Sequence, residues 1–225
     1  MRDTAQSLFA FLFMSTITGE RRPIAARHWN ISKMAAQRLA QFGISPNAIS
    51  VSGLLFALAA GAAFATTPFA GRWTPVLWIV GAVGIGLRLL CNMLDGMVAV
   101  EGGKVTKLGE LFNEIPDRFA DAAILIGLGY SVGGHFVLGF IAAIAAVLTA
   151  YIRAVGKVAG ARQEFCGPMA KQQRMAVAIV VALVSSIVAT NWLPAAGLAV
   201  IIGGSLITAI RRLLRIAVQL RMEAS

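Results

Sequence analysis

The chain has 225 residues, of which 58% are hydrophobic and only 13% are charged, and its mean hydropathy is +0.77. These values lie outside the usual range of soluble domains, so they exclude an ordinary water-soluble enzyme and indicate an integral membrane protein. In such a chain the formal net charge of +10 reflects topology and attraction to anionic membrane lipids, and we expect no nucleic-acid partner.

The first 46 residues form an N-terminal segment ahead of the membrane spans. Residues 1–16 are partly apolar but lack a small-residue cleavage site, so we expect them to lie on the membrane or against the bundle rather than to be a signal peptide. Residues 23–41 mix apolar side chains with basic ones such as Arg27, Lys33 and Arg38. This mixture predicts an amphipathic helix at the membrane interface.

Six apolar runs are long enough to cross a hydrocarbon layer of about 30 Å as helices. They cover residues 48–67, 73–100, 109–130, 135–155, 175–190 and 194–214. The sequence therefore predicts an all-α integral membrane protein. A six-transmembrane-helix bundle at 47–217 would follow an N-terminal interfacial segment at 1–46 and precede a cytoplasmic tail at 218–225.

Basic residues alternate between the two ends of the predicted spans. Lys and Arg gather before the first span, after the second, fourth and sixth, and only Arg72 lies in the other connections. Because cytoplasmic loops are enriched in Lys and Arg, we expect both termini on the cytoplasmic side of the cell inner membrane. Cys91 and Cys166 lie toward this reducing side, so we expect no structural disulfide.

Most of the acidic residues are concentrated in one part of this apolar chain. Six of the ten lie between positions 95 and 121: Asp95, Glu101, Glu110, Glu114, Asp117 and Asp121. A carboxylate at the bilayer centre costs about 2.5–3.5 kcal/mol even on the lenient scale, so the cluster predicts a polar cavity with a function. Single members could instead have a structural role: Asp117, like its neighbour Arg118, could serve an ion pair with another helix, and the Glu residues could be solvated at a helix start.

Helical spacing arranges this cluster into two polar stripes. One stripe lies on the second span and consists of Asn92, Asp95, Gly96 and Ala99. The other lies on the third span and consists of Gly109, Asn113, Asp117 and Asp121. The short link between the spans predicts antiparallel helices whose stripes face each other. Oxygen ligands without histidine or thiolate favour Mg²⁺, which often shares its site with substrate phosphates.

The residues from Asn92 to Ala99 and from Gly109 to Asp117 resemble a known signature in both type and spacing. This is the signature D-x2-D-G-x2-A-R-x8-9-G-x3-D-x3-D of the CDP-alcohol phosphatidyltransferase family. The six-span plan with an amphipathic N-terminal helix is also similar to that family. Two shorter stretches add to the resemblance: residues 45–47 before the first span, and residues 151–154 at the end of the fourth.

The resemblance implies transfer of a phosphatidyl group from CDP-diacylglycerol, or a related CDP-alcohol, to a small acceptor alcohol with release of CMP. It implies divalent ions, Mg²⁺ or Mn²⁺, held by the signature aspartates on the diphosphate, and it makes Asp117 the general base. It places Gly96, Ala99 and Gly109 against the substrate. It also allows a homodimer among the membrane lipids.

This sequence departs from the signature at three positions. Asn92 and Asn113 stand where the first and third aspartates are expected, and Val100 stands where the arginine is expected. An amide oxygen can bind a hard cation but brings no negative charge, so we expect weaker metal binding unless Glu110 or Glu114 compensates. The resulting metal set is Asn92, Asp95, Asn113, Asp117 and Asp121. Two outcomes stay open: an enzyme with altered metal ligation, including a one-metal site, or a non-catalytic lipid-binding or membrane assembly protein.

The acceptor is predicted from basic residues at the cytoplasmic ends of the fourth and fifth spans. They are Arg153, Lys157, Arg162, Lys171 and Arg174. Such a group favours a phosphorylated polyol, for example glycerol 3-phosphate or an inositol phosphate. The alternative is that these side chains bind anionic lipid headgroups. Arg153 is the strongest candidate because it lies in the stretch that resembles the family.

Overall fold

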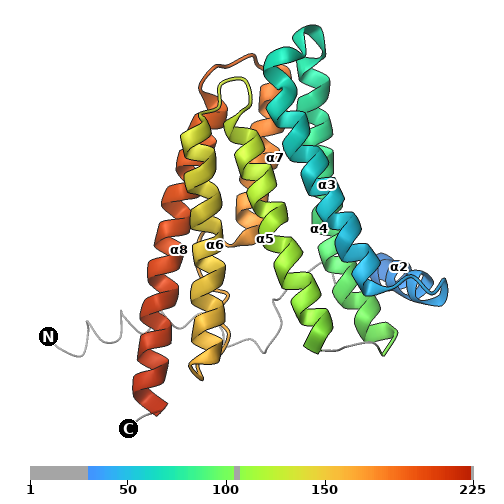
Figure 1. The fold of residues 1–225 in the computed structure, drawn as a ribbon, viewed down its shortest axis with the longest axis vertical. Helices are drawn as coiled ribbons and strands as arrows, with labels where there is room; N and C mark the ends of the chain where they lie inside the picture. Colours follow the sequence, from blue (N-terminus) through green and yellow to red (C-terminus); the bar gives the residue numbers. More distant parts are fainter. Residues whose placement is uncertain (1–29, 104–106, 224–225) are drawn as a thin grey trace, which may run out of the picture.

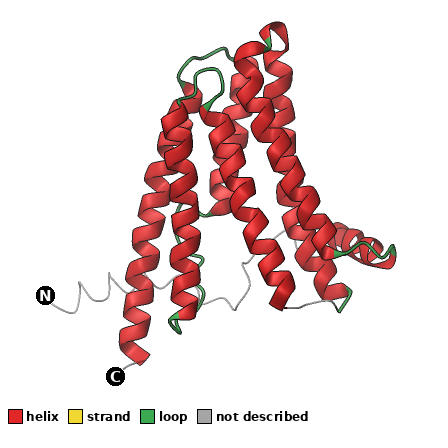
Figure 2. Cartoon of the chain, viewed as in Figure 1, coloured by secondary structure: helices red, strands yellow, loops and turns green. Residues whose placement is uncertain are grey.

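The computed structural model describes residues 30–103 and 107–223, and within these ranges the protein consists of α-helices joined by turns, loops and two short 3-10 helices, η2 (Thr67–Phe69) and η3 (Gly71–Trp73) (Figure 1, Figure 2). The helices are α2 (Asn30–Gln41), α3 (Pro46–Thr66), α4 (Thr74–Glu101), α5 (Lys107–Gly129), α6 (Phe136–Val158), α7 (Lys171–Ile187) and α8 (Leu193–Glu223). The all-α prediction is confirmed for this part of the chain. Residues 1–29, which include residues 23–29 of the predicted amphipathic helix, lie outside it.

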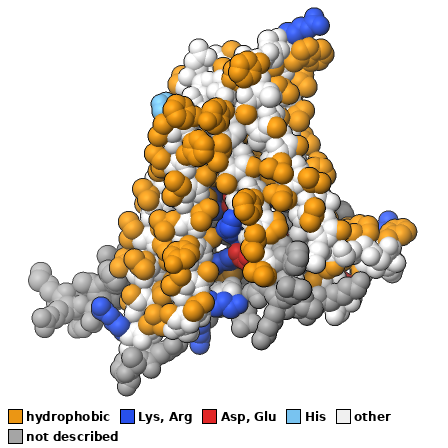
Figure 3. Space-filling model, viewed as in Figure 1, with side chains coloured by type: hydrophobic (Ala, Val, Ile, Leu, Met, Phe, Trp, Pro, Cys, Tyr) orange, Lys and Arg blue, Asp and Glu red, His pale blue; other side chains and the backbone are white. Residues whose placement is uncertain are grey.

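Each predicted span coincides with one of the long helices α3 to α8. In the part of the chain that the structure describes, four stretches are long and apolar enough to cross a membrane: Pro46–Phe69, Gly71–Glu101, Phe136–Val158 and Leu193–Met222. The helix α7 is only 17 residues long, and α5 carries charged residues through its first half. The exterior of the bundle is apolar over most of the face in Figure 3, as expected for a surface that meets lipid. The protein is therefore an integral membrane protein.

The start of α3 is fixed by local sequence. The Ser45 hydroxyl accepts a hydrogen bond from the backbone N–H of Ala48 at 3.1 Å, and Pro46 occupies the first turn. A serine cap satisfies one of the otherwise unpaired N–H groups at a helix start, and proline is tolerated there because its missing N–H is not needed. The chain thus begins α3 one turn before Ser50, which faces α4.

The short helix α2 lies across the lower end of α4 in Figure 1, rather than along the bundle. Its buried Ala36 belongs to a small apolar cluster with Ile49 of α3 and Met93, Met97 and Val98 of α4. The cluster anchors α2 beside the last turns of α4, where the polar stripe of that helix lies.

Small residues bring α3 and α5 into backbone contact. A Cβ atom added to Gly127 would lie 2.2 Å from the Gly61 carbonyl oxygen, and one added to Gly61 would lie 2.4 Å from the Ala123 carbonyl oxygen. Helices in membranes use such residues because close approach increases van der Waals contact. The contact fixes the position of α5 against α3 above the polar stripe.

We expect Gly127→Ala to lower the free energy of unfolding by about 1–3 kcal/mol, because the added methyl group has no space between two backbones. The measurement is thermal unfolding in detergent followed by tryptophan fluorescence. The matched control is Gly86→Ala in α4, where an added Cβ meets nothing within 4 Å. Equal melting temperatures for the two variants would contradict the close crossing of α3 and α5.

Candidate active site

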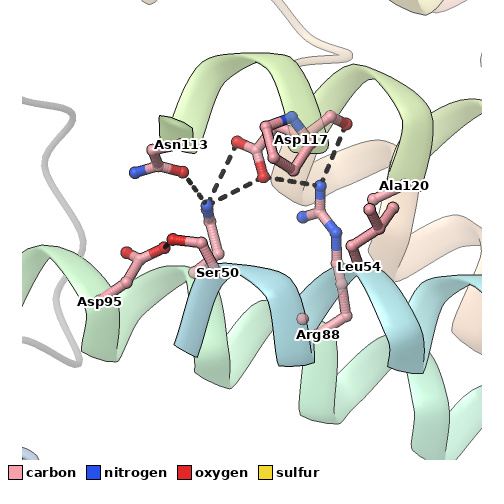
Figure 4. A pocket seen from close by; sticks show the side chains of 10 residues that line it. Ser50, Leu54, Arg88, Asp95, Asn113, Asp117 and Ala120 are labelled. Carbon is pink, nitrogen blue, oxygen red and sulfur yellow. Dashed lines mark hydrogen bonds and ion pairs between the residues drawn. The ribbon is translucent and has the colours of Figure 1, made fainter. Parts of the chain in front are cut away.

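The two polar stripes face each other as the sequence predicted. The Asn92 amide of α4 donates to Asn113 Oδ1 of α5 at 3.1 Å and to both Asp117 carboxylate oxygens at 3.0 and 3.2 Å. Figure 4 shows Asn113 and Asp117 pointing from α5 toward α4. The site therefore lies between the second half of α4 and the first half of α5, in the lower half of the bundle in Figure 1.

Asp117 accepts hydrogen bonds from three other side chains of this site. Besides Asn92, it accepts a hydrogen bond from Arg88 Nη2 at 3.1 Å and one from the Lys171 ammonium. The Asp117 side chain is 17% exposed, whereas the Arg88 side chain is almost completely buried. Because two cations and an amide donate to one carboxylate, the Asp117 side chain is held in a fixed orientation.

Lys171 and Arg174 reach the site from the first turn of α7. Cations at a helix N-terminus are disfavoured by the helix dipole, and the side chain of Ala170 makes no cap there. The carboxylates of α5 compensate, since Lys171 pairs with Asp117 and Arg174 pairs with Asp121. Both basic side chains are buried, so the structure places them inside the bundle rather than exposed at its end.

Asp121 lies one turn deeper than Asp117 and is also buried. Its Oδ1 accepts from Arg88 Nη2 at 2.8 Å, and its Oδ2 accepts from Arg174 Nη2 at 3.2 Å. Arg174 is further held by Thr149 Oγ1 at 3.1 Å and by the Met169 carbonyl oxygen at 3.0 Å. Asp121 thus orients two arginines, while its role as a metal ligand stays a prediction.

Asp95 lies on the other side of the opening, at the α3 contact. Its Oδ2 accepts from the Ser50 hydroxyl at 2.8 Å, and the residue is only 3% exposed. The predicted substrate-contact residues Gly96 and Ala99 follow it on α4, and Gly109 lies in the first turn of α5. All three are partly exposed, and their contact with substrate stays a prediction.

Glu114 makes contacts that the sequence did not indicate. It pairs with Arg118 of its own helix at 2.8 Å and with Arg153 of α6. Arg153 also lies over the ring of Phe165 at 5.2 Å. Glu114 therefore holds the arginine predicted to bind the acceptor, instead of replacing a missing metal ligand. The side chain of Glu110 is outside the described part, and Lys157 lies exposed in the last turn of α6.

The loop before α7 is tied to α8 and α6. Arg212 of α8 donates to the Cys166 carbonyl oxygen at 3.0 Å and to the Thr149 carbonyl oxygen at 2.7 Å. Both cysteines are free, as predicted, and burial raises the pKa of the Cys166 thiol. These contacts fix the loop from which Lys171 starts α7.

A small cavity of about 10 Å³ opens between the stripes (Figure 4). Its lining includes Ser50 and Leu54 of α3, together with Arg88, Asn92, Asp95, Asn113, Pro116, Asp117 and Ala120. One guanidinium nitrogen of the lining residue Arg88, Nη1, is buried and has no hydrogen-bond partner among the described residues. The volume is about that of one water-sized particle.

The donor set of this cavity suits one hard cation better than two. Asp95 and Asp117 supply carboxylate oxygens and Asn113 an amide oxygen, which are ligand types that Mg²⁺ and Mn²⁺ accept. Among the side chains that the structure describes, no three His, Cys, Asp or Glu residues form a group that could hold a metal ion. The ligand types that line the cavity therefore suit a single divalent ion.

Sequence reasoning missed Ser50 and Arg88 as site residues. A signal for Arg88 was present, because it lies four residues before Asn92 on the same helical face. No comparable signal marks Ser50, which reaches Asp95 from a different helix, 45 positions away.

Comparison with known proteins agrees with this geometry. Residues 43–211 match the family model described as CDP-alcohol phosphatidyltransferase. The archaetidylinositol phosphate synthase of Pyrococcus horikoshii is 28% identical over 149 residues, which are 66% of this chain and 74% of that protein.

Two solved structures of the phosphatidylinositol phosphate synthase of Mycobacterium tuberculosis share the fold. The one with CDP-DAG bound has a TM-score of 0.69 at 23% identity and covers 84% of this chain and 94% of its own. The one in complex with manganese and citrate has a TM-score of 0.68 at 23% identity, and the match covers 82% of this chain and 88% of that chain. The family match spans most of the 225 residues and includes both stripes, so this chain belongs to the CDP-alcohol phosphatidyltransferase family.

Proposed function

We propose that the protein transfers a phosphatidyl group from CDP-diacylglycerol to a phosphorylated polyol, with release of CMP. The acceptor hydroxyl oxygen forms a bond to the phosphorus that carries diacylglycerol, and the bond from that phosphorus to the CMP oxygen breaks. The observation that carries the proposal is Asp117, an oriented carboxylate at a cavity between the two signature stripes. The relatives support the donor and the acceptor class, since one structure holds CDP-DAG and both relatives are named as inositol phosphate lipid synthases.

Within this reaction Asp117 takes the proton of the acceptor hydroxyl. A divalent ion bound by Asp95, Asn113 and Asp117 would supply positive charge for the diphosphate. Lys171 and Arg88 hold Asp117 in place.

Acceptor recognition is proposed for the basic groups on the α6 side of the site. Arg153 and Lys157 would contact the phosphate of the acceptor, whereas Arg174 acts through Asp121. The manganese complex of the M. tuberculosis enzyme supports Mg²⁺ or Mn²⁺ as the ion.

We further propose the membrane arrangement that the charge pattern favours. All six helices α3 to α8 span the inner membrane as residues 47–217, α2 lies at the interface, and the termini and the site face the cytoplasm. Arg72 lies in the connection between α3 and α4, at the opposite end of the bundle from the site, whereas Lys157 lies in the last turn of α6 and Lys171 begins α7 at the other end, and this difference supports the orientation. A homodimer fits the same arrangement.

The direct test is CMP release from CDP-diacylglycerol by purified protein with Mg²⁺ or Mn²⁺ and a panel of acceptors. We expect release with an inositol phosphate or glycerol 3-phosphate and little with free inositol or serine. Absence of CMP with every acceptor would overturn the proposal.

Arg153→Met is expected to raise KM for the phosphorylated acceptor by roughly 10- to 100-fold, with a smaller change in kcat. The reason is loss of one charge-assisted hydrogen bond, worth about 1.5–3 kcal/mol. Initial rates of CMP release against acceptor concentration provide the measurement. Arg72→Met, at the opposite end of the bundle, is the control and should leave KM unchanged. An unchanged KM for Arg153→Met would remove Arg153 from the acceptor site.

One observation favours a second candidate, a lipid-binding or assembly protein without catalysis. Both oxygens of Asp117 already accept hydrogen bonds, from Asn92, Arg88 and Lys171. A protein of this kind would bind CDP-diacylglycerol without releasing CMP, so the same assay separates the two functions when binding is measured in parallel.

A further inference from the structure

A fixed cation occupies the centre of the site, between residues at two signature positions. Lys171 Nζ donates to Asn92 Oδ1 at 2.9 Å and to the Asp117 carboxylate. The Lys171 side chain is 6% exposed, and its helix begins from a loop that Arg212 holds. The ammonium group is therefore positioned by the fold rather than free in solvent.

The amide of Asn92 contributes to this arrangement. Its oxygen accepts from Lys171, while its nitrogen donates to Asn113 Oδ1 and to Asp117. A carboxylate at position 92 would bring negative charge and could not donate these hydrogen bonds. Asn92 and Lys171 are thus complementary, and together they place positive charge where a carboxylate would attract a metal ion.

The balance of charges in the site also disfavours a second divalent ion. The carboxylates of the described ion-pair network and its neighbour Asp95 are outnumbered by the cations that surround them. The carboxylates are Asp95, Glu114, Asp117 and Asp121, and the cations are Arg88, Arg118, Arg153, Lys171 and Arg174. Two divalent ions about 3.5–4 Å apart, as in two-metal sites, would add four positive charges to a site whose carboxylates are already outnumbered by cations.

The cavity also offers a donor for an anion. Arg88 Nη1 is buried and has no partner among the described residues, although a buried donor of this kind normally has one. An oxygen of a bound diphosphate at the cavity would satisfy it. Arg88 lines the cavity, and Lys171 contacts Asn92 and Asp117, which also line it, so both cations are available to an anion bound there.

We infer that Lys171, assisted by Arg88, replaces one of two divalent ions, so that each chain binds a single divalent ion and holds the diphosphate with that ion and these two side chains. Only the identity of the anion rests on the proposed function. The number of ions follows from Asn92, Lys171 and the cavity alone.

The test is Mn²⁺ binding to purified full-length protein in detergent, with free Mn²⁺ followed by electron paramagnetic resonance. We expect one Mn²⁺ per chain for the native protein and for Asn92→Asp/Asn113→Asp, in which Lys171 remains. The triple variant Asn92→Asp/Asn113→Asp/Lys171→Met should bind two. Lys33→Met, which removes an exposed lysine of α2, is the control and should leave one.

Two Mn²⁺ or none on the native protein would overturn the inference, and so would a triple variant that binds only one. A second measurement covers a triple variant that fails to fold. Lys171→Met should weaken CDP binding at least 10-fold while Lys171→Arg weakens it less than 3-fold, and equal losses for both would count against the inference. One bound Mn²⁺ without CMP release would instead refute the proposed function and leave the ion count intact.

Discussion

Asp117→Asn is expected to reduce CMP release by about 10²- to 10⁴-fold, the range typical of a lost general base. The amide keeps the size of the side chain and can still accept from Asn92 and Arg88, but it cannot take the acceptor proton. The measurement is the initial rate with saturating CDP-diacylglycerol and acceptor. Size-exclusion elution and melting temperature of the variant show whether the fold is kept.

The control for this prediction is Glu101→Gln, which alters an exposed carboxylate at the end of α4. Its rate should match that of the native protein. Full activity in Asp117→Asn would show that another group takes the proton. If the lower rate is fully accounted for by a lower melting temperature and a smaller folded fraction, Asp117 has a purely structural role.

Asp121→Asn is expected to have the largest effect on stability, a loss of about 3–5 kcal/mol. Asp121 accepts from Arg88 and Arg174, and each arginine is 1% exposed. Without the carboxylate, both guanidinium groups remain buried with too little negative charge beside them. Thermal unfolding in detergent should show the loss as a melting temperature many degrees below that of the native protein.

Glu164→Gln is the comparison for Asp121→Asn. Glu164, in the loop before α7, also pairs with an arginine, but Arg215 of α8 lies 3.6 Å away and the two side chains are 15% and 13% exposed, against 2% for both members of the Asp121–Arg174 pair. We expect a loss of about 1 kcal/mol or less, as for ordinary ion pairs near a surface. Equal losses for the two variants would mean that the buried Asp121 pair is no more important than a peripheral one.

The helices could be predicted from the sequence because each apolar run is long and bounded by charged or turn residues. The facing of Asn92 and Asn113 could also be predicted, since two helices joined by a short link must run antiparallel. The Lys171 contact with Asn92 could not, because 79 positions separate the residues and periodicity within one helix does not identify the helix that packs against it. The family prediction rested on spacing and is confirmed.

Glu114 shows a second limit of the sequence. Its position one turn before other stripe residues suggested a replacement for missing metal ligands, and the charge count alone allowed this. In the structure the neighbouring arginines decide its role, because Arg118 is four residues away on the same helix and Arg153 arrives from α6. Charge type is visible in a sequence, but the partner that neutralises it is a property of the packing.

The lean of α5 has a consequence for how substrates arrive. In Figure 1 the lower half of α5 diverges from α6, and in Figure 3 charged side chains are visible between apolar columns on this lateral face. A two-tailed lipid donor that reached these charged side chains from this face would find the enzyme by two-dimensional diffusion within the leaflet. The water-soluble acceptor would instead approach from the aqueous phase. The site would therefore bring together one substrate dissolved in the membrane and one dissolved in water.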